Sequence, residues 1–346
     1  MRANSHRRIA LSAAINALPR AQFLLGPTPI ERQPRLSEKL GVDLLVKRDD
    51  LTGLAFGGNK VRQLEFYFGK ILAAGADTVL ITGAVQSNYV RVAAACAARL
   101  GLKCHIQLEE RVPDVDAVYR TNGNVLINML LGASLYSYPN GEDEAGADRR
   151  LHELAEDLKR QGHRPYVIPL GANNPPTGAL GYVVCAEELL GQLDEFDHVV
   201  VASGSGHTQA GVLFGLRTLN WPGTVHGVCV RRSTSLQRSR IVGHCDRLAE
   251  LLGISSPVTP SDIHVYDDVF LPGYGRLNDI TSDTIRTCAQ LDGLVLDPVY
   301  TGCAMSGLFR CIRDGRVPAR SRVLFIHTGG LPALFGYATA FQKNLG

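Results

Sequence analysis

A lysine follows two glycines in the segment FGGNKVRQLEFYF, at the point where a helical pattern begins. At a helix start beside buried strands, desolvation and the helix dipole both disfavour the ammonium form of Lys60, which makes the neutral amine a better nucleophile. A solvated surface lysine at a turn explains this segment better when the segment is taken alone. Chemistry at Lys60 therefore depends on what other segments contribute.

The segment SGSGHTQAG follows the apolar run HVVVA and precedes the helical pattern AGVLFGLRTL. Backbone amides at a helix N-terminus, with small residues that permit close approach, form an anion site. Ser203, Ser205 and Thr208 add hydroxyl donors. A glycine-rich turn without a ligand is the alternative, since such turns are common. The segment is not a Walker loop, and it lacks the downstream acid of a dinucleotide fingerprint.

The segment GAVQSNYVR places Gln86, Ser87 and Asn88 at the start of an alanine-rich helix. One serine or asparagine there is explained by helix capping. Three polar side chains, followed by Tyr89 and Arg91, favour a second hypothesis, which is a site for a substrate carboxylate.

These segments follow apolar runs that alternate with longer amphipathic stretches, a pattern typical of an α/β fold with a mostly parallel sheet. In such sheets the ligand site lies beyond the carboxyl ends of the strands. The first thirty residues predict an ordinary N-terminal helix, and residues 294–296 form a short apolar piece. The predicted strands are residues 43–47, 78–82, 103–108, 165–168, 198–202, 224–230 and 323–327.

The chain resembles the D-cysteine desulfhydrase and 1-aminocyclopropane-1-carboxylate deaminase group of fold type II (tryptophan-synthase-β-like) pyridoxal phosphate enzymes. The resemblance extends in order through GPTPIERQPRLSEKLG, KRDDLTGLAFGGNKVRQLE, QSNYVR, RPYVIPLGANNPPTGALGY, SGSGHTQAG, PGYGRLND, DPVYTGCAMSG and HTGGLPALFGY. It implies two lobes of mostly parallel sheets flanked by helices. Residues 1–60 and 171–346 would form the large cofactor-binding domain, and residues 61–170 a small mobile domain that closes over substrate. It also implies a homodimer.

The resemblance further implies roles for individual residues. Lys60 would hold pyridoxal 5′-phosphate as a Schiff base and shuttle the α-proton. Asn88 would donate a hydrogen bond to the phenolic oxygen of the cofactor, and Thr328 would lie near its pyridine nitrogen. Ser87 would contact the substrate carboxylate or transfer protons, and Tyr300 would face the amino acid. The phosphate loop would comprise Ser203, Gly204, Ser205, Gly206, His207 and Thr208, and further substrate contacts are expected from Gln86, Asn88, Tyr89 and Thr301.

Two threonines bear on the reaction. Deaminases of this group carry Glu at the position of Thr301 and Leu at the position of Thr328, so both residues resemble the desulfhydrase branch. Without the acid, the ring nitrogen is less readily kept protonated and the electron sink is milder. We therefore expect a carbon–sulfur lyase that releases pyruvate, ammonia and sulfide or sulfite by β-elimination, with 1-aminocyclopropane-1-carboxylate deaminase as the alternative.

The sequence departs from desulfhydrase relatives at His207, where SGSAGTHAG is common, and at Tyr89, where QSNH is common. One hypothesis is a larger and more anionic leaving group than a thiol, such as the sulfonate of L-cysteate, assisted by Arg91. The other is that His207 packs beside the phosphate and Tyr89 fills core space. The substrate, D-cysteine or L-cysteate, and its chirality stay open.

Composition argues against several other classes of protein, namely nucleic-acid-binding, metal-binding and membrane proteins. The 36 basic and 33 acidic residues are interspersed, so nucleic-acid binding has no electrostatic support. The eight cysteines lie singly, without zinc spacing, and we interpret them as reduced thiols in a protein without a metal. No stretch approaches the roughly 18 apolar residues of a membrane span, so a cytoplasmic protein is expected. Competing classes are a dinucleotide-binding oxidoreductase and a non-catalytic ligand-binding protein.

Overall fold

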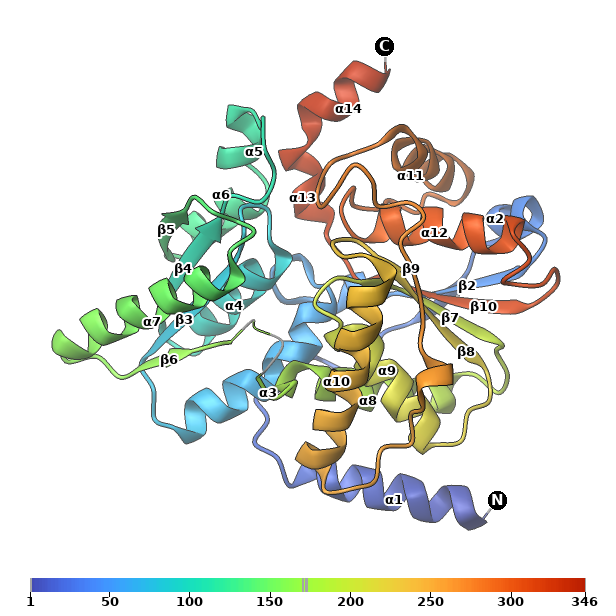
Figure 1. The fold of residues 1–346 in the computed structure, drawn as a ribbon, viewed down its shortest axis with the longest axis horizontal. Helices are drawn as coiled ribbons and strands as arrows, with labels where there is room; N and C mark the ends of the chain where they lie inside the picture. The colour runs from blue at the N-terminus through green and yellow to red at the C-terminus, as the bar shows by residue number, and fades with distance from the viewer. Residues whose placement is uncertain (1, 170, 172–173, 346) are drawn as a thin grey trace.

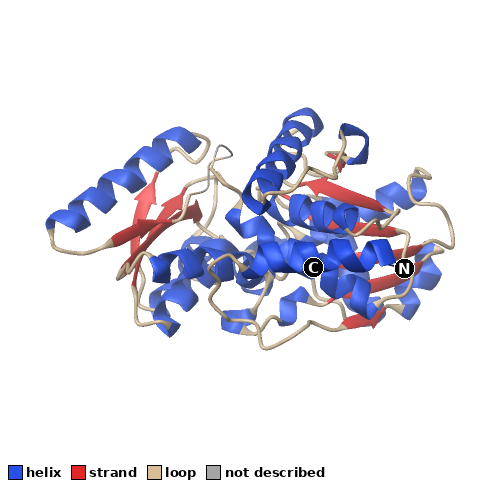
Figure 2. Ribbon diagram, turned by 90° about the horizontal axis from the view of Figure 1, so that it is seen from below, coloured by secondary structure: helices blue, strands red, loops and turns tan. Residues whose placement is uncertain are grey.

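The computed structural model describes residues 2–169, 171 and 174–345, and it contains two separate β-sheets with helices on their faces (Figures 1 and 2). The larger sheet has the order β1-β2-β10-β7-β8-β9 and is parallel except for β1, which runs antiparallel to β2. The smaller sheet has the order β5-β4-β3-β6 and is parallel throughout. The strands are β1 (Ile30–Arg32), β2 (Asp43–Lys47), β3 (Thr78–Ala84), β4 (Lys103–Glu109), β5 (Ser134–Tyr138), β6 (Pro165–Val167), β7 (His198–Ser203), β8 (Thr224–Cys229), β9 (His264–Tyr266) and β10 (Arg322–Ile326).

Helices connect the parallel strands, as crossover connections require. The α-helices are α1 (Arg2–Asn16), α2 (Pro34–Leu40), α3 (Asn59–Ala73), α4 (Asn88–Arg99), α5 (Ala117–Thr121), α6 (Asn124–Leu130), α7 (Glu144–Arg160), α8 (Leu180–Gln192), α9 (His207–Thr218), α10 (Thr234–Leu252), α11 (Asp279–Asp292), α12 (Thr301–Arg313), α13 (Leu331–Gly336) and α14 (Ala338–Leu345). Short 3₁₀ helices are η1 (Asp49–Leu51), η2 (Leu54–Phe56), η3 (Thr177–Ala179) and η4 (Pro260–Asp262). None of the described helices combines the length and apolar composition that crossing a bilayer requires.

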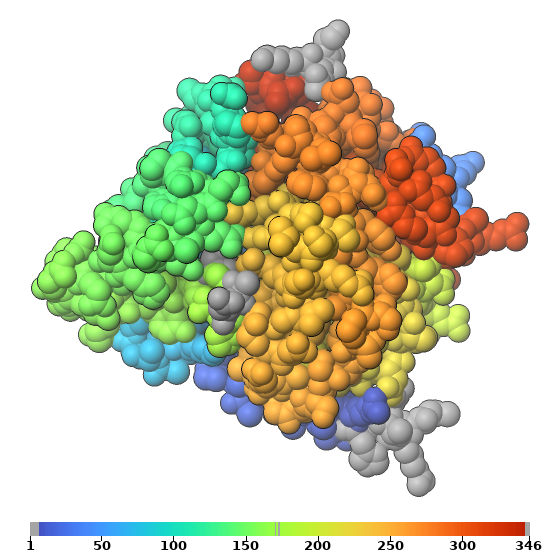
Figure 3. All heavy atoms as spheres, in the orientation of Figure 1, coloured from blue at the N-terminus to red at the C-terminus, as the bar shows by residue number. Residues whose placement is uncertain are grey.

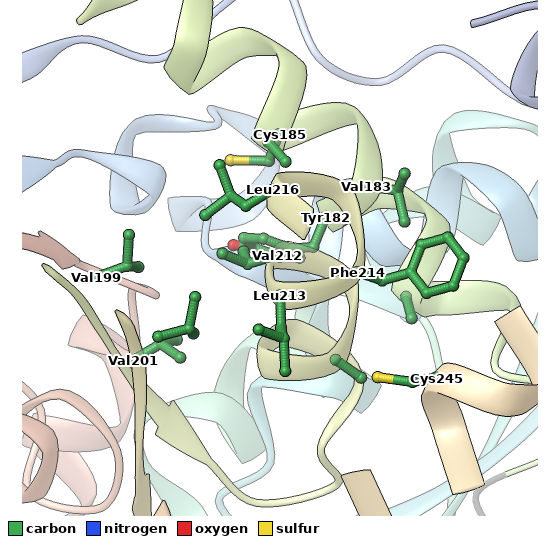
Figure 4. Close-up of a cluster of buried hydrophobic side chains, with 14 of the residues drawn as sticks. Tyr182, Val183, Cys185, Val199, Val201, Val212, Leu213, Phe214, Leu216 and Cys245 are labelled. Carbon is green, nitrogen blue, oxygen red and sulfur yellow. The ribbon is translucent and has the colours of Figure 1, made fainter. Parts of the chain in front are cut away.

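The larger sheet is buried on both faces, which is why its central strands read as continuous apolar runs. Val199 and Val201 of β7 pack with α8, α9 and α10 on one face (Figure 4). Val200 and Ala202 pack with α2, α11 and α12 on the other. Alternate residues of one strand thus contribute to two cores.

The smaller sheet is covered in the same way. Val79 and Ile81 of β3 pack with α3 and α4, whereas Leu80 packs with α7. Helix α3 also reaches the larger sheet, because its Phe66 belongs to the core that contains α8 and α9. The predicted domain boundary after Lys60 therefore falls in the first turn of a helix that packs against both cores, and the division into domains stays a prediction.

The seven predicted strands are confirmed, with ends that differ from the prediction by at most two residues, and the predicted N-terminal helix corresponds to α1. The sequence pattern missed β1, β5 and β9, and residues 294–296 form no strand. Residues 172 and 173 of the predicted segment GANNPPTGALGY lie outside the described residues. The eight cysteines are buried and form no disulfide.

Candidate active site

Two glycines position Lys60 at the start of α3. Gly57 and Gly58 have φ angles of 61° and 111°, in a region that side chains with a Cβ rarely adopt. A Cβ on Gly57 would lie 2.2 Å from the carbonyl oxygen of Asp50, and one on Gly58 would lie 2.9 Å from that of Thr328. The turn therefore packs directly against the segment that follows β10, and it places Lys60 at the carboxyl end of the larger sheet.

The Lys60 amine is held in a partly buried, weakly polar environment. Its Nζ lies 3.2 Å from Oε1 of Gln63 and 5.5 Å from the centre of the Tyr89 ring. Burial lowers the pKa of Lys60 to about 8. A larger fraction of the amine is therefore neutral near pH 7 than for an exposed lysine, as nucleophilic attack and proton transfer require.

The glycine-rich loop after β7 ends at the N-terminus of α9. Gly206, with φ of 91°, caps this helix without a side-chain hydrogen bond. The first amides of a helix have no acceptor within the helix, so those of α9 are suited to bind an anion. Thr208 accepts hydrogen bonds at Oγ1 from the side-chain amides of Asn59 and Gln63, each at 2.9 Å. Its hydroxyl hydrogen is left to donate, so loop and helix fit a phosphate group.

Donors from α10 and from the segment after β8 hold the backbone of this loop. Arg232 donates to the carbonyl oxygen of Gly204 at 3.0 Å. The carbonyl oxygen of Ser205 accepts from Arg240 Nε at 3.0 Å and from His244 Nε2 at 2.9 Å. The glycine-rich loop is therefore fixed from outside before any ligand binds.

The start of helix α4, which follows β3 of the smaller sheet, supplies polar groups to the site. Ser87 caps the helix by accepting from the Tyr89 amide at 3.2 Å, and its hydroxyl hydrogen is left to donate. Asn88 accepts at Oδ1 from Asn124 Nδ2 at 3.1 Å. Because the Asn88 oxygen is engaged, its amide hydrogens remain to donate to an acceptor such as a phenolic oxygen.

Tyr300 lies at the start of α12, with its hydroxyl 2.6 Å from that of Tyr274. Burial, and then the neighbouring Tyr274, raise the pKa of Tyr300 well above its usual value. Its hydroxyl therefore stays protonated and acts as a neutral hydrogen-bonding group.

The carboxyl ends of both sheets meet around one cavity, which brings most of the predicted residues together. Glu144 is the sole carboxylate residue among the described residues that line it. The predicted residues that line the cavity are Lys60, Ser87, Asn88, Tyr89, Gly204, Ser205, Gly206, His207, Thr208, Tyr300 and Thr328.

Besides Arg91, three predicted residues make contacts elsewhere and do not line the cavity. Gln86 donates to the carbonyl oxygens of Tyr119 and Asn122 at 2.6 and 2.9 Å, which ties the turn before α4 to the end of α5. Ser203 bonds to Gln209 at 2.6 Å and to Gln237 at 2.8 Å. Thr301 bonds to Asp297 at 2.7 Å. Each of the three stabilises the backbone that carries a lining residue.

The positions of two other predicted residues bear on the leaving group. His207 packs against His244, with ring centres 4.7 Å apart, and burial lowers its pKa well below the usual value, so the imidazole is neutral. Arg91 does not line the cavity, and it donates to the carbonyl oxygen of Gly57 at 2.9 Å. Arg91 therefore holds the turn before Lys60.

Several charged and polar residues that line the cavity were not predicted from the sequence. Arg111 follows β4, and Arg231 and Arg232 follow β8, so the rule that ligands bind at strand ends could have found these three. Arg240 lies on α10 and Glu144 at the start of α7, and their approach depends on how the two sheets pack together. The other missed lining residues include Asn59, Gln63 and Tyr274, the last within the matched segment PGYGRLND.

Comparison with known proteins identifies the family. The sequence pattern of the family described as pyridoxal-phosphate dependent enzyme matches residues 21–329. The chain belongs to this family. It is 43% identical over 326 residues to D-cysteine desulfhydrase of Salmonella typhimurium and to that of Salmonella typhi, a match that covers 93% of this chain and 97% of each relative. The predicted cofactor, pyridoxal 5′-phosphate, and the predicted family are thereby confirmed.

Solved structures agree with this membership in the pyridoxal-phosphate-dependent family. A crystal structure of an ACC deaminase homologue has a TM-score of 0.88 and 37% identity, covering 96% of this chain and 98% of that one. Threonine deaminase isoform 2 from Solanum lycopersicum, at 18% identity and a TM-score of 0.65, covers 95% of this chain and 90% of its own and shares the fold. The predicted fold type II architecture is confirmed, and a dinucleotide-binding oxidoreductase is left without support.

Proposed function

We propose that this protein is a carbon–sulfur lyase that catalyses β-elimination from a cysteine-like amino acid. D-Cysteine is the first candidate substrate, because relatives that cover nearly the whole chain are D-cysteine desulfhydrases. The observation that carries the proposal is the presence of Lys60, with its lowered pKa, in the same cavity as the anion site of α9. The products would be pyruvate, ammonia and sulfide.

Bound pyridoxal phosphate supplies an electron sink for the charge that develops at the substrate α-carbon. The α9 amides and Thr208 would hold its phosphate, and Asn88 would donate to its phenolic oxygen. Lys60 would anchor the cofactor and then, as a neutral amine, take the α-proton. Ser87 has a hydroxyl hydrogen left to donate to the substrate carboxylate.

Thr328 favours elimination over ring opening. This neutral side chain lines the cavity at the end of the larger sheet. Deaminases of the group have Leu at the position of Thr328 and Glu at the position of Thr301, directly after the DPVY motif. Thr301, at the position of that Glu, bonds to Asp297. Neither threonine has a carboxylate that would keep the pyridine nitrogen of the cofactor protonated, so the cofactor would be a milder electron sink. The deaminase reaction on 1-aminocyclopropane-1-carboxylate is therefore the less favoured alternative.

A second candidate substrate is L-cysteate, whose β-substituent is a sulfonate. Arg111, Arg231, Arg232 and Arg240 all line the cavity, and guanidinium groups bind oxyanions well. Arg111 has a carboxylate of its own in Glu109, at 2.6 Å, whereas Arg231, Arg232 and Arg240 share the one carboxylate of Glu144, so these three are the better candidates. The product from this substrate would be sulfite in place of sulfide.

The lobes and the assembly form part of the same proposal. Residues 61–170, which contain the four-stranded sheet, would act as the mobile domain that excludes water when substrate is bound. We propose a cytoplasmic homodimer without nucleic-acid partners, as is usual for fold type II enzymes.

The test is a substrate screen on the purified, cofactor-loaded protein. Release of the 2-oxo acid is measured, as pyruvate from D-cysteine, L-cysteine, D-cysteate and L-cysteate and as 2-oxobutyrate from 1-aminocyclopropane-1-carboxylate, with Lys60→Ala as the inactive control. The proposal predicts turnover of at least one sulfur-containing substrate by the wild type. Turnover of the cyclopropane alone, or activity of Lys60→Ala equal to wild type, would contradict it.

A further inference from the structure

Three arginines of the large lobe meet one carboxylate of the small lobe at the rim of the active-site cavity. Arg231 and Arg232 follow β8, Arg240 lies on α10, and Glu144 begins α7. Glu144 forms ion pairs with Arg231 at 2.8 Å, with Arg232, and with Arg240 at 3.8 Å. In Figure 3 the green segment that contains Glu144 touches the yellow segment that contains the arginines. We call these three arginines the rim cluster.

Positive charge in the rim cluster exceeds what Glu144 balances. The three arginine side chains are 9–15% exposed, and the Glu144 side chain that they share is 33% exposed. Burial, and then the neighbouring Arg240, lower the pKa of Arg232 to about 10, despite the attraction of Glu144. Glu142 adds little, since it is 4.0 Å from Arg231 and 76% exposed. A buried cationic cluster of this kind favours a further anion.

The rim cluster is also rigidly placed beside the cofactor site. Arg232 donates to the Gly204 carbonyl oxygen and Arg240 to that of Ser205, so both side chains are attached to the phosphate loop. Arg231 instead donates to the Gly141 carbonyl oxygen at 3.4 Å, in the segment before α7. An anion that replaces Glu144 would therefore lie between the phosphate loop and the small lobe, where it also touches both lobes.

We propose that the rim cluster is an oxyanion subsite, for a sulfonate or sulfate group, and that Glu144 is a tethered carboxylate that occupies it until such a group enters. Glu144 makes the subsite selective, because an incoming anion must bind the three guanidinium groups more strongly than the Glu144 carboxylate does in order to displace it. Displacement also breaks ion pairs between the lobes, so occupancy of the subsite is coupled to their separation and closure. The subsite is distinct from the α9 amides that would bind the cofactor phosphate.

The test measures binding of unreactive anions to the cofactor-loaded protein, so it does not depend on the proposed lyase reaction. Sulfate and ethanesulfonate are titrated by calorimetry at fixed ionic strength into wild type, Glu144→Gln and Glu153→Gln. Glu153→Gln is the matched control, because it makes the same charge change on the same helix at an exposed pair with Arg150. Folding is checked by circular dichroism.

A tethered group competes at an effective concentration of roughly millimolar or above. We therefore expect Glu144→Gln to bind the anions about tenfold more tightly than wild type or Glu153→Gln. Adding Arg231→Met should reverse the gain. The anion that gains more, inorganic sulfate or the organic sulfonate, identifies the source that the subsite fits.

Equal anion affinity in Glu144→Gln and wild type would overturn the proposal. A second result would also overturn it: sulfate competes with pyridoxal phosphate during reconstitution but does not bind the cofactor-loaded protein. The arginines would then belong to the cofactor site. If Glu144→Gln does not fold, Glu144→Asp takes its place, since the shorter side chain weakens the same ion pairs; it should show a smaller gain of the same sign, and no gain would overturn the proposal.

Discussion

A buried charged network beneath α3 determines where Lys60 lies, and Asp49 is at its centre. The Asp49 carboxylate accepts from Arg62 Nε and Nη2, each at 2.9 Å, from Thr28 at 2.7 Å and from Tyr182 at 2.5 Å. Its backbone carbonyl accepts from the amide of Gly58, in the turn before Lys60, at 3.1 Å. Replacing Asp49 by Asn removes the charge with almost no change in shape.

The expected loss in Asp49→Asn follows from these contacts. Each hydrogen bond to a charged group contributes about 1.5–3 kcal/mol, and removing one partner of a buried ion pair costs about 3–5 kcal/mol. The NH₂ group of the new asparagine would also face groups of Arg62, Thr28 or Tyr182 that donate to the Asp49 carboxylate. We expect the free energy of unfolding to fall by about 3–5 kcal/mol, a large share of the roughly 5–15 kcal/mol of a typical domain.

Urea unfolding, followed by the fluorescence of Trp221, measures this loss. Asp157→Asn is the control, because its ion pair with Arg160 is exposed and contributes less than about 1 kcal/mol. Asp49→Asn should also retain pyridoxal phosphate less tightly. A loss below about 1 kcal/mol with unchanged cofactor retention would show that the Asp49 network does not position Lys60.

The same network makes the free energy of unfolding depend on pH in the acidic range. Interactions with Arg62, Tyr182 and Thr28 outweigh burial and hold the pKa of Asp49 below its usual value. The contribution of Asp49 is therefore fully present above the unfolded-state pKa of about 3.9 and is lost as the pH falls toward the folded-state pKa. Asp49→Asn should lack this part of the acid dependence.

Three further predictions concern the cavity. Amine labelling of Lys60 in the cofactor-free protein should have a midpoint near pH 8, as its pKa indicates, and a midpoint near pH 10 would contradict the burial argument. Asn124→Ala releases the Asn88 amide, so the dissociation constant of pyridoxal phosphate should rise by about tenfold, a loss of about 1.4 kcal/mol; an unchanged constant counts against that orientation. Tyr274→Phe removes the partner of the Tyr300 hydroxyl and should lower kcat/KM about fivefold without changing cofactor affinity, whereas an unchanged kcat/KM would show that the pair does not position substrate.

The long apolar strands were predictable because burial on both faces makes them continuous apolar runs. β1 and β9 have three residues each and carry polar side chains, and β5 reads SLYSY, so neither length nor hydrophobicity distinguishes them from loops. Their pairing is supplied by neighbouring strands that are distant in the sequence.

The cavity was predictable where functional residues directly follow strands or begin helices, as Lys60, Ser87 and Thr208 do. Local sequence could not separate a residue that faces the cavity from one that supports its backbone. Thr301 and Ser203 lie beside lining residues, yet both bond to neighbouring side chains. Glu144 could not be predicted because only the packing of one lobe on the other brings it to the cavity.

We propose that Lys60 carries pyridoxal phosphate in this cavity. The direct measurement is to load the protein with cofactor, treat it with borohydride, which makes a lysine–pyridoxal linkage permanent, and locate the modified peptide by mass spectrometry. We predict cofactor on Lys60, and an absorption band at about 410–430 nm that Lys60→Ala lacks. A protein without the band, or a cofactor bound to another lysine, would contradict the claim.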